Sequence, residues 1–180
     1  YYEPRSRIYH NPNNIPKKKM IKDRLSSQYK TKDPGELLQI DSVVRFEFGI
    51  KRYIITAIDL KSRFTFAFAY KALSSKMALD FMKKLEIVVP FDINGIKTDN
   101  GLEFHGEFDD YLKQKGIKHY WSYPRTPKSN SYIERFNRTI QDEFVNANVE
   151  YIEDVMVFNK RLIDYLIYYN TVRPVSYTHL

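Results

Sequence analysis

The chain contains no cysteine, which excludes a disulfide framework, a zinc site built with cysteine and a cysteine nucleophile. It also lacks long apolar runs: none approaches the roughly 18 residues that a helix needs to cross a bilayer. No charged-then-apolar leader opens the sequence. These absences predict a soluble, unexported protein, and the lack of cysteine is compatible with a reducing compartment.

Acidic residues are scarce at the start of the chain. Residues 1–36 hold nine Lys and Arg against four Asp and Glu, a net charge of +5 out of +7 for the whole chain. A basic arm attached to a nearly neutral domain favours a polyanion such as DNA as the partner, and a solvated tether is the alternative. Lys17, Lys18 and Lys19 form a continuous run in this arm. Because the first residue is Tyr1 rather than Met, we expect a fragment of a longer protein.

Material for a core is ample, since 43% of the residues are hydrophobic and 16% are aromatic. Residues 1–36 contain several Pro and Asn and show no sustained apolar periodicity, which predicts a basic linker or arm, with a short helix near 20–29. The patterning then predicts a core over 37–146 and a C-terminal helical extension of that core over 147–174.

Within the core, β-branched and aromatic residues predict strands at 37–48, 52–58, 64–70, 93–98 and 117–123. Apolar residues at helical spacing predict a helix between Ser74 and Pro90 and others at 107–115, 132–146 and 152–170, with a loop over 124–131. This order predicts an α/β fold with a ribonuclease H-like mixed sheet: three antiparallel strands, then alternating helix and strand, with flanking helices.

Three acidic residues stand where such a fold brings chain segments together. Asp41 lies inside the first strand, Asp99 ends the fourth, and Glu134 lies in the first turn of the helix after the loop. Each acid alone could be a helix cap, a turn residue or an ion-pair partner. Together they form a hard-oxygen site that suits Mg²⁺ or Mn²⁺, and two such ions catalyse phosphoryl transfer in many enzymes.

The sequence around these acids resembles the integrase catalytic core of retroviral integrases and bacterial insertion-sequence transposases, the DDE superfamily. The matching segments are 39–41, 98–104 and 127–139, and 34 residues separate Asp99 from Glu134, close to the usual spacing. The resemblance covers about 34–174. It implies that Asp41, Asp99 and Glu134 bind two metal ions, and that the DNA of an element's ends is first cut by water and then joined to target DNA through its 3′-hydroxyl.

The resemblance also implies partners and a location. We expect DNA as substrate, a homodimer or higher oligomer on that DNA, and a cytoplasmic, nucleoid-associated protein. Cations and amides near Glu134 are candidates for holding DNA, beside the lysines of the arm. These candidates are Lys128, Asn130, Arg135, Asn137 and Arg138. A helix-surface salt bridge between Glu134 and Arg138 is the alternative for the last of them.

Two features depart from the family pattern. The loop before the glutamate reads Asn130-Ser131 where Asn-Gly is usual, which removes some backbone freedom. The spacing to Glu134 is also slightly short, with the lost residue expected near 108–116. Neither change removes a carboxylate, so we expect activity to survive.

Other residues have simpler interpretations. His105, His119 and Trp121 are expected to serve packing, and the stripe of Leu162, Tyr165, Leu166 and Tyr169 is expected to face the core. Two other functions stay open: a ribonuclease H-like nuclease, which would take an acid from the first helix at Asp80 or Glu86, and a non-catalytic DNA-binding relic.

The end of the chain is unusual. Residues 169–174 fit the family text, and the fit stops at Val175. Residues 175–180 can be back-translated as GTC TCT TAT ACA CAT CTN, which reads as the transposon-end adapter of sequencing libraries. We expect these residues to be an assembly artefact.

Overall fold

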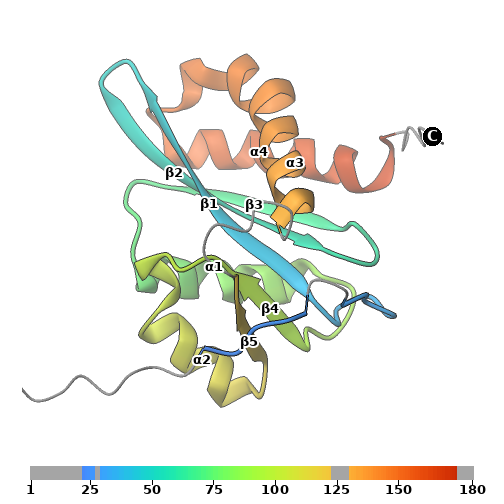
Figure 1. Ribbon diagram of the computed structural model, residues 1–180. Coiled ribbons are helices and arrows are strands. Elements are labelled where there is room, and N and C mark those ends of the chain that lie inside the picture. The colour runs from blue at the N-terminus through green and yellow to red at the C-terminus, as the bar shows by residue number, and fades with distance from the viewer. Residues whose placement is uncertain (1–21, 27–28, 123–129, 174–180) are drawn as a thin grey trace, which may run out of the picture.

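The computed structural model describes residues 22–26, 29–122 and 130–173. A five-stranded sheet forms its centre, with helices packed around it (Figure 1). The strands are β1 (Leu38–Glu47), β2 (Ile50–Asp59), β3 (Thr65–Tyr70), β4 (Gly95–Thr98) and β5 (Lys118–Trp121). The helices are α1 (Ser75–Val88), α2 (Glu107–Lys115), α3 (Ser131–Ile140) and α4 (Val155–Thr171), with short helical turns η1 (Leu102–Phe104), η3 (Gln141–Val145) and η4 (Asn146–Tyr151).

The sheet has the strand order β3-β2-β1-β4-β5. The first three strands form an antiparallel meander, and β4 and β5 add to it in parallel. The predicted mixed sheet is therefore confirmed. Gln39 of β1 lies opposite Lys97 of β4, so two residues further along the same register Asp41 faces the end of β4, where Asp99 follows.

Local sequence accounts for the ends of the helices between these strands. The Ser74 side chain accepts a hydrogen bond from the Met77 backbone N–H at 3.3 Å, which caps α1 as predicted. Helix α2 closes at Gly116, whose φ of 72° lies in the left-handed region that glycine adopts without strain. These helices cover the β3 and β5 parts of the sheet respectively and also contact each other.

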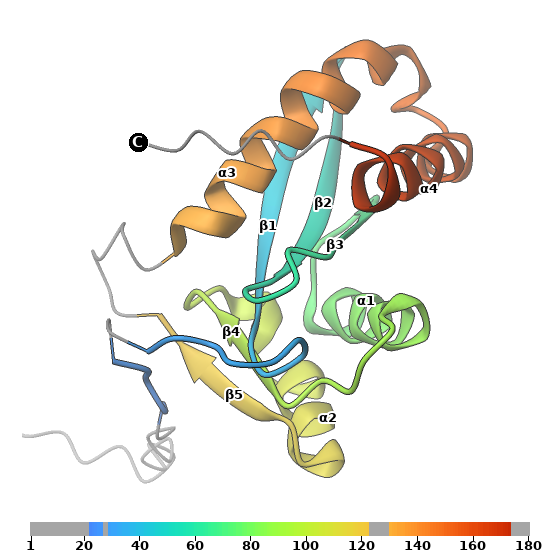
Figure 2. The same ribbon diagram turned by 90° about the vertical axis from the view of Figure 1, so that its right-hand side faces the viewer.

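The two C-terminal helices complete the core. Helix α3 packs against β1 and β2, and α4 packs against β3 (Figure 2). Ile152, Phe158, Leu162 and Leu166 belong to the same buried cluster as the strands, so the helical extension over 147–173 shares one hydrophobic core with the sheet. The predicted stripe is confirmed as a core face, since its two leucines are buried and its two tyrosines pack against the cluster.

Two predicted helices differ from the structure. The helix expected over 132–146 is regular only to Ile140 and continues as the π-helical turn η3, because its hydrogen-bonding pattern shifts there. The helix expected near 20–29 is wrong for the described residues 22–26, where Asp23 instead forms a parallel bridge with Tyr120.

The rest of the arm before Lys22, residues 123–129 and the suspected artefact at 175–180 lie outside the described residues. Within the described ranges, no helix is long and apolar enough to span a membrane.

Candidate active site

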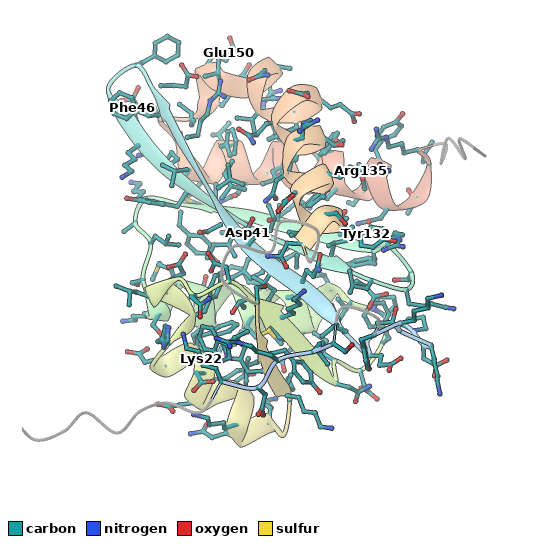
Figure 3. All side chains as sticks on the ribbon, viewed as in Figure 1. Lys22, Asp41, Phe46, Tyr132, Arg135 and Glu150 are labelled. Atoms are coloured by element: carbon teal, nitrogen blue, oxygen red, sulfur yellow. The ribbon has the colours of Figure 1, made fainter. Side chains whose placement is uncertain are left out.

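Asp41 lies on the face of β1 that packs against α3, in the middle of the long strand (Figure 3). One carboxylate oxygen, Oδ1, accepts the Ser42 backbone N–H at 2.9 Å, and the other, Oδ2, accepts the Asn137 side-chain amide at 2.8 Å. Burial raises the pKa of Asp41 to about 6, and the negative charges of Asp99 and Glu134 add to the rise, while both hydrogen bonds oppose it. Asp41 therefore senses the other two acids electrostatically.

Asp99 is exposed and directly follows β4. Its Oδ1 accepts the Gly101 backbone N–H at 2.8 Å, which folds the turn back on itself. Asn100 ties this turn to its surroundings, because its amide donates to the Ser122 carbonyl at 3.2 Å and its Oδ1 accepts from the Lys22 ammonium at 2.7 Å. One carboxylate oxygen of Asp99 is therefore engaged within its own turn, while the residue as a whole is exposed to solvent.

Glu134 is exposed in the first turn of α3. The opposite side of this helix is buried and fixes it against the sheet through Ile133, Phe136, Asn137 and Ile140. Arg135 and Arg138 are exposed on the same helix. Across the described residues, no ion pair joins Glu134 to Arg138, so the salt-bridge alternative is not what this structure shows.

Asp41 in the central strand, Asp99 after β4 and Glu134 in the first turn of α3 do not form a closed cage. In the part of the chain that the structure describes, no group of three or more His, Asp or Glu side chains is close enough to hold a metal ion. The donors nevertheless fit a hard divalent cation, since all three are carboxylates and a cation relieves the mutual repulsion recorded in the raised pKa of Asp41. Asp99 and Glu134 are exposed and can rotate toward Asp41.

Asn137 is 7% exposed and works inside the protein. Besides donating to Asp41, its Oδ1 accepts a hydrogen bond from the Thr56 hydroxyl at 2.7 Å. The same hydroxyl approaches the Asp41 carbonyl at 3.3 Å, across the β1–β2 pair. The amide is therefore fixed in orientation, with its nitrogen toward Asp41. A DNA contact at Asn137 stays a prediction, and the structure gives this residue a positioning role beside it.

The remaining predicted DNA contacts are placed unevenly. Asn130 precedes α3, and its Oδ1 accepts a hydrogen bond from the Ser122 hydroxyl at 3.0 Å, which links the end of β5 to the start of the helix that carries Glu134. Lys128 and the three lysines of the arm, Lys17, Lys18 and Lys19, lie outside the described residues.

Glu103 is a carboxylate near the site to which the sequence assigned no role. Its Oε1 accepts a hydrogen bond from the Ser42 hydroxyl at 2.8 Å, next to Asp41 in the chain. It folds back over Gly101: a Cβ added to that glycine would lie 2.6 Å from the Glu103 carboxylate. The signal was available in principle, because Glu103 belongs to the matched segment 98–104.

The two histidines pack as predicted. The His119 ring stacks near Trp121 at a centroid distance of 4.2 Å, and the His105 ring lies 4.5 Å from the same indole. His119 Nδ1 lies 2.8 Å from Asp109 Oδ1, and burial lowers the pKa of His119. Trp121 is 2% exposed. These rings pack together at β5, next to the turn that carries Asp99.

A groove of about 520 Å³ runs from Glu134 along β1 and α3. Its walls come from β1 on one side and from α3 with the following turns on the other. The lining residues are Ser42, Val43, Val44, Arg45, Glu134, Asn137, Arg138, Gln141, Asp142 and Asn146. Of the three acids, Glu134 lines this groove, and Ser42 and Asn137, which both hydrogen-bond to Asp41, line it as well.

Comparison with known proteins identifies the family. One family model, described as an integrase core domain, matches residues 31–127, and a second with the same description matches residues 115–176. The chain belongs to the integrase core domain family. The expected membership in the DDE superfamily of integrases and transposases is confirmed.

Curated relatives support the same assignment for this integrase core. A putative integrase, ORF3, of Spiroplasma virus SpV1-C74 is 32% identical over 82% of this chain and 46% of its own length. The retrovirus-related Pol polyprotein of transposon TNT 1-94 from Nicotiana tabacum is 30% identical over 53% of this chain and 7% of that protein. The chain therefore spans less than half the length of each of these relatives.

Solved structures confirm the ribonuclease H-like fold. The integrase catalytic core domain of HTLV-2, solved with magnesium in a dimeric form, has a TM-score of 0.64 at 19% identity, covering 79% of this chain and 91% of that one. An intasome of simian T-cell lymphotropic virus, in complex with a PP2A regulatory subunit, has a TM-score of 0.68 at 17% identity, covering 91% and 57%.

Proposed function

We propose that this integrase core cuts and joins DNA, with Asp41, Asp99 and Glu134 as its catalytic carboxylates. One observation carries the proposal: a partly buried aspartate lies next to the strand end that bears Asp99, and its pKa is raised by burial and, to a smaller extent, by the charges of both other acids. Such convergence of like charge is costly for folding and marks a site built to bind cations.

The proposed reaction has two steps. Water hydrolyses a phosphodiester at the end of the element, which leaves a 3′-hydroxyl on the element and a 5′-phosphate on the flanking strand. That hydroxyl then attacks a phosphodiester of target DNA, forming a new bond to phosphorus while the target's own 3′-oxygen leaves. No covalent link to the protein is needed, so no serine or tyrosine nucleophile is required.

Two Mg²⁺ or Mn²⁺ ions are the proposed cofactors, held by the three acids. When bound, such ions activate the attacking oxygen and stabilise the charge on the leaving oxygen. In this chain, Asn137 and the Ser42 backbone hold the Asp41 carboxylate in place through its two oxygens. The hydrogen bonds of Asn100 hold the turn that presents Asp99. These residues orient the acids and do not take part in bond breaking.

DNA is the proposed substrate, and the exposed cations beside the acids are its proposed contacts. Arg135 and Arg138 project from the helix that carries Glu134. They offset the repulsion between phosphates and the acidic site. Lys128, Asn130 and the lysines Lys17, Lys18 and Lys19 remain proposed contacts on the loop and arm that flank the site in sequence.

A ribonuclease H-like nuclease is the second candidate, and the structure gives it less support. Its acid from the first helix would have to come from α1 and replace Glu134, but Asp80 accepts a hydrogen bond from the Tyr70 hydroxyl at 2.8 Å and is ion-paired with Lys84. Glu86 accepts from the Tyr111 hydroxyl. Both α1 acids are therefore engaged in contacts of their own. A non-catalytic relic is disfavoured because all three acids are retained.

A strand-transfer assay tests the proposal. The full-length protein is incubated with oligonucleotides that carry the ends of its element, a supercoiled target plasmid and Mg²⁺ or Mn²⁺. Glu134→Gln is expected to reduce the rate of DNA joining by at least about a hundredfold, because the neutral amide is a poor ligand for a hard cation. Glu150→Gln, an exposed change in η4 away from Asp41 (Figure 3), is the matched control and should join DNA normally. Normal joining by Glu134→Gln would refute the assignment.

A further inference from the structure

The groove beside the acids extends well past them, toward Arg45 near the far end of β1. Arg45 and Asp41 are four residues apart, so their side chains leave the strand on the same face, roughly 13 Å apart along it. This is too far for Arg45 to touch the bond that reacts. Any function of the far end of the groove is therefore distinct from contact with the reacting bond.

The Arg45 guanidinium is only partly satisfied by the protein. Its Nη2 donates to the Asn146 Oδ1 at 2.9 Å and pairs with Glu47 at 2.5 Å. Its Nε–H is buried and, among the described residues, is the one buried side-chain donor or acceptor without a hydrogen-bond partner. An unmet buried donor is costly, and the fork of Nε and Nη suits an acceptor that offers two oxygens.

The opposite wall supplies a second cation. Arg138 is exposed on α3, lines the same groove and, within the described part of the chain, has no ion-pair partner within 4 Å. The groove also contains two acids, Glu134 at the catalytic end and Asp142 in the following turn η3. An anion is therefore favoured at the Arg45 end and opposed by Asp142.

We propose that Arg45 and Arg138 form a binding site for one phosphate of the DNA strand, separate from the phosphate that reacts. This inference rests on the proposed function and names a further contact for its substrate. Phosphates follow one another by about 3.4 Å along the axis of each strand, so roughly 13 Å places this contact within about four nucleotides of the reacting bond. The pair with Glu47 is only partly buried, and in this proposal it gives way as Arg45 turns its fork to the phosphate.

The site is tested by neutralising single phosphates. Duplexes carrying the element's end receive one methylphosphonate at each of the first six positions from the scissile phosphate. Their affinity for the full-length protein is measured in EDTA, which separates binding from reaction. We expect one position within four nucleotides to weaken binding about tenfold, because one charge-assisted contact is lost. On unmodified DNA, Arg45→Gln should bind about tenfold more weakly than the parent. When the methylphosphonate stands at that one position, Arg45→Gln should show no further loss, whereas methylphosphonates at the other positions should affect it as they affect the parent.

Matched variants sharpen the outcome. Arg161→Gln removes an equal charge on α4, where Arg161 stacks on Tyr151 away from the groove, and should keep the full methylphosphonate profile. Asp142→Asn should tighten binding by about threefold at low salt, since it removes the opposing charge. Thermal melts confirm that each variant is folded.

Three results overturn this inference alone: Arg45→Gln that keeps the positional loss, Arg45→Gln that behaves as Arg161→Gln, or a flat profile for the parent. A parent that shows the expected profile yet joins no DNA would refute the proposed reaction and leave this phosphate site standing. A parent that binds no DNA would refute both.

Discussion

Asn137 donates a hydrogen bond of 2.8 Å to Asp41 across 96 residues of sequence. Since the Thr56 hydroxyl donates to the other end of the same amide, the orientation of Asn137 is fixed from both sides. The helix that carries Glu134 is thereby locked to the strand that carries Asp41. Together with the buried apolar side chains of α3, this amide sets the spacing of two proposed catalytic acids.

Asn137→Asp tests that dependence. The change places a second carboxylate against Asp41 in a position that is 7% exposed, so repulsion replaces a hydrogen bond. We expect the free energy of unfolding at pH 7.5 to fall by about 2 kcal/mol in urea denaturation. Asn94→Asp, an exposed change of the same kind, is the control. Equal stability of the two variants would mean that Asn137 does not hold Asp41.

The raised pKa of Asp41 predicts a pH-dependent cost. A carboxyl group whose pKa is higher in the folded state destabilises the fold when it ionises. The cost is absent below the unfolded pKa of 3.8, grows as the pH rises to about 6 and is constant above that. We therefore expect the stability of Asp41→Asn relative to the parent to increase by about 1–2 kcal/mol between pH 4 and pH 6.5. Urea unfolding in EDTA across this range measures it, and a pH-independent difference would contradict the prediction.

The features that depend on residues close together in the sequence could be predicted from the sequence. Strands and helices follow from local periodicity, and the expectation that Asp41 and Asp99 lie in one region follows from strand pairing, which the structure shows between the first residues of β1 and the residues of β4. The cap at Ser74 and the closing Gly116 were also local signals. These features need no knowledge of distant contacts, which explains why the pattern was sufficient.

Contacts between segments that are far apart in the chain could not be predicted from the sequence. Nothing in the apolar pattern marks the pairing of Asp23 with β5, because an edge bridge needs only backbone groups. The role of Asn137 depends on a partner 96 residues away. The shift to a π-helical turn after Ile140 depends on packing around Phe144 and Val145, whose spacing is also compatible with a regular helix.

An apolar groove between α4 and β3 predicts self-association. Ile163 and Ile167 are 41% and 59% exposed and line this groove of about 220 Å³ with Phe64 and Phe66. We expect the integrase core to form a dimer through this face, and Ile167→Asp to weaken the dimer by at least about tenfold, because a charge replaces buried apolar area. Sedimentation velocity measures the change. Met156→Asp, at a residue near the start of α4 that is 83% exposed, should leave the dimer intact, and a dimer that survives Ile167→Asp would exclude this face.

The basic arm reaches the described structure at the edge of the active site. The Trp121 backbone N–H donates to the Asp23 carbonyl at 2.8 Å, and Lys22 contacts both Asn100 and the Trp121 ring. Lys22, the first described residue of the arm, therefore lies beside the turn that carries Asp99. Neutralising Lys17, Lys18 and Lys19 should weaken DNA binding and reduce the slope of log affinity against log salt by up to about three units.

The control for the arm removes the same charge elsewhere. Lys71, Lys76 and Lys118 are exposed, and changing them to glutamine should leave most of the slope unchanged. Filter binding between low and high salt gives both slopes. An unchanged slope in the arm variant would make the arm a tether, and equal losses in both variants would indicate a diffuse effect of net charge.

Variants of Glu103 test whether this residue acts through its hydrogen bond to Ser42 or through its charge. Its carboxylate accepts from the Ser42 hydroxyl and lies folded over Gly101, whose backbone N–H in turn donates to Asp99. Glu103→Gln keeps an acceptor oxygen for Ser42, whereas Glu103→Ala removes it and leaves the turn unsupported. If Glu103 acts by position, the glutamine variant should join DNA within about twofold of the parent, while the alanine variant should lose about tenfold and about 1 kcal/mol of stability. Strand-transfer rates at saturating and limiting Mg²⁺ decide between the two roles. A glutamine variant that is rescued only by high Mg²⁺ would show that the charge of Glu103, rather than its hydrogen bond to Ser42, is what the site requires.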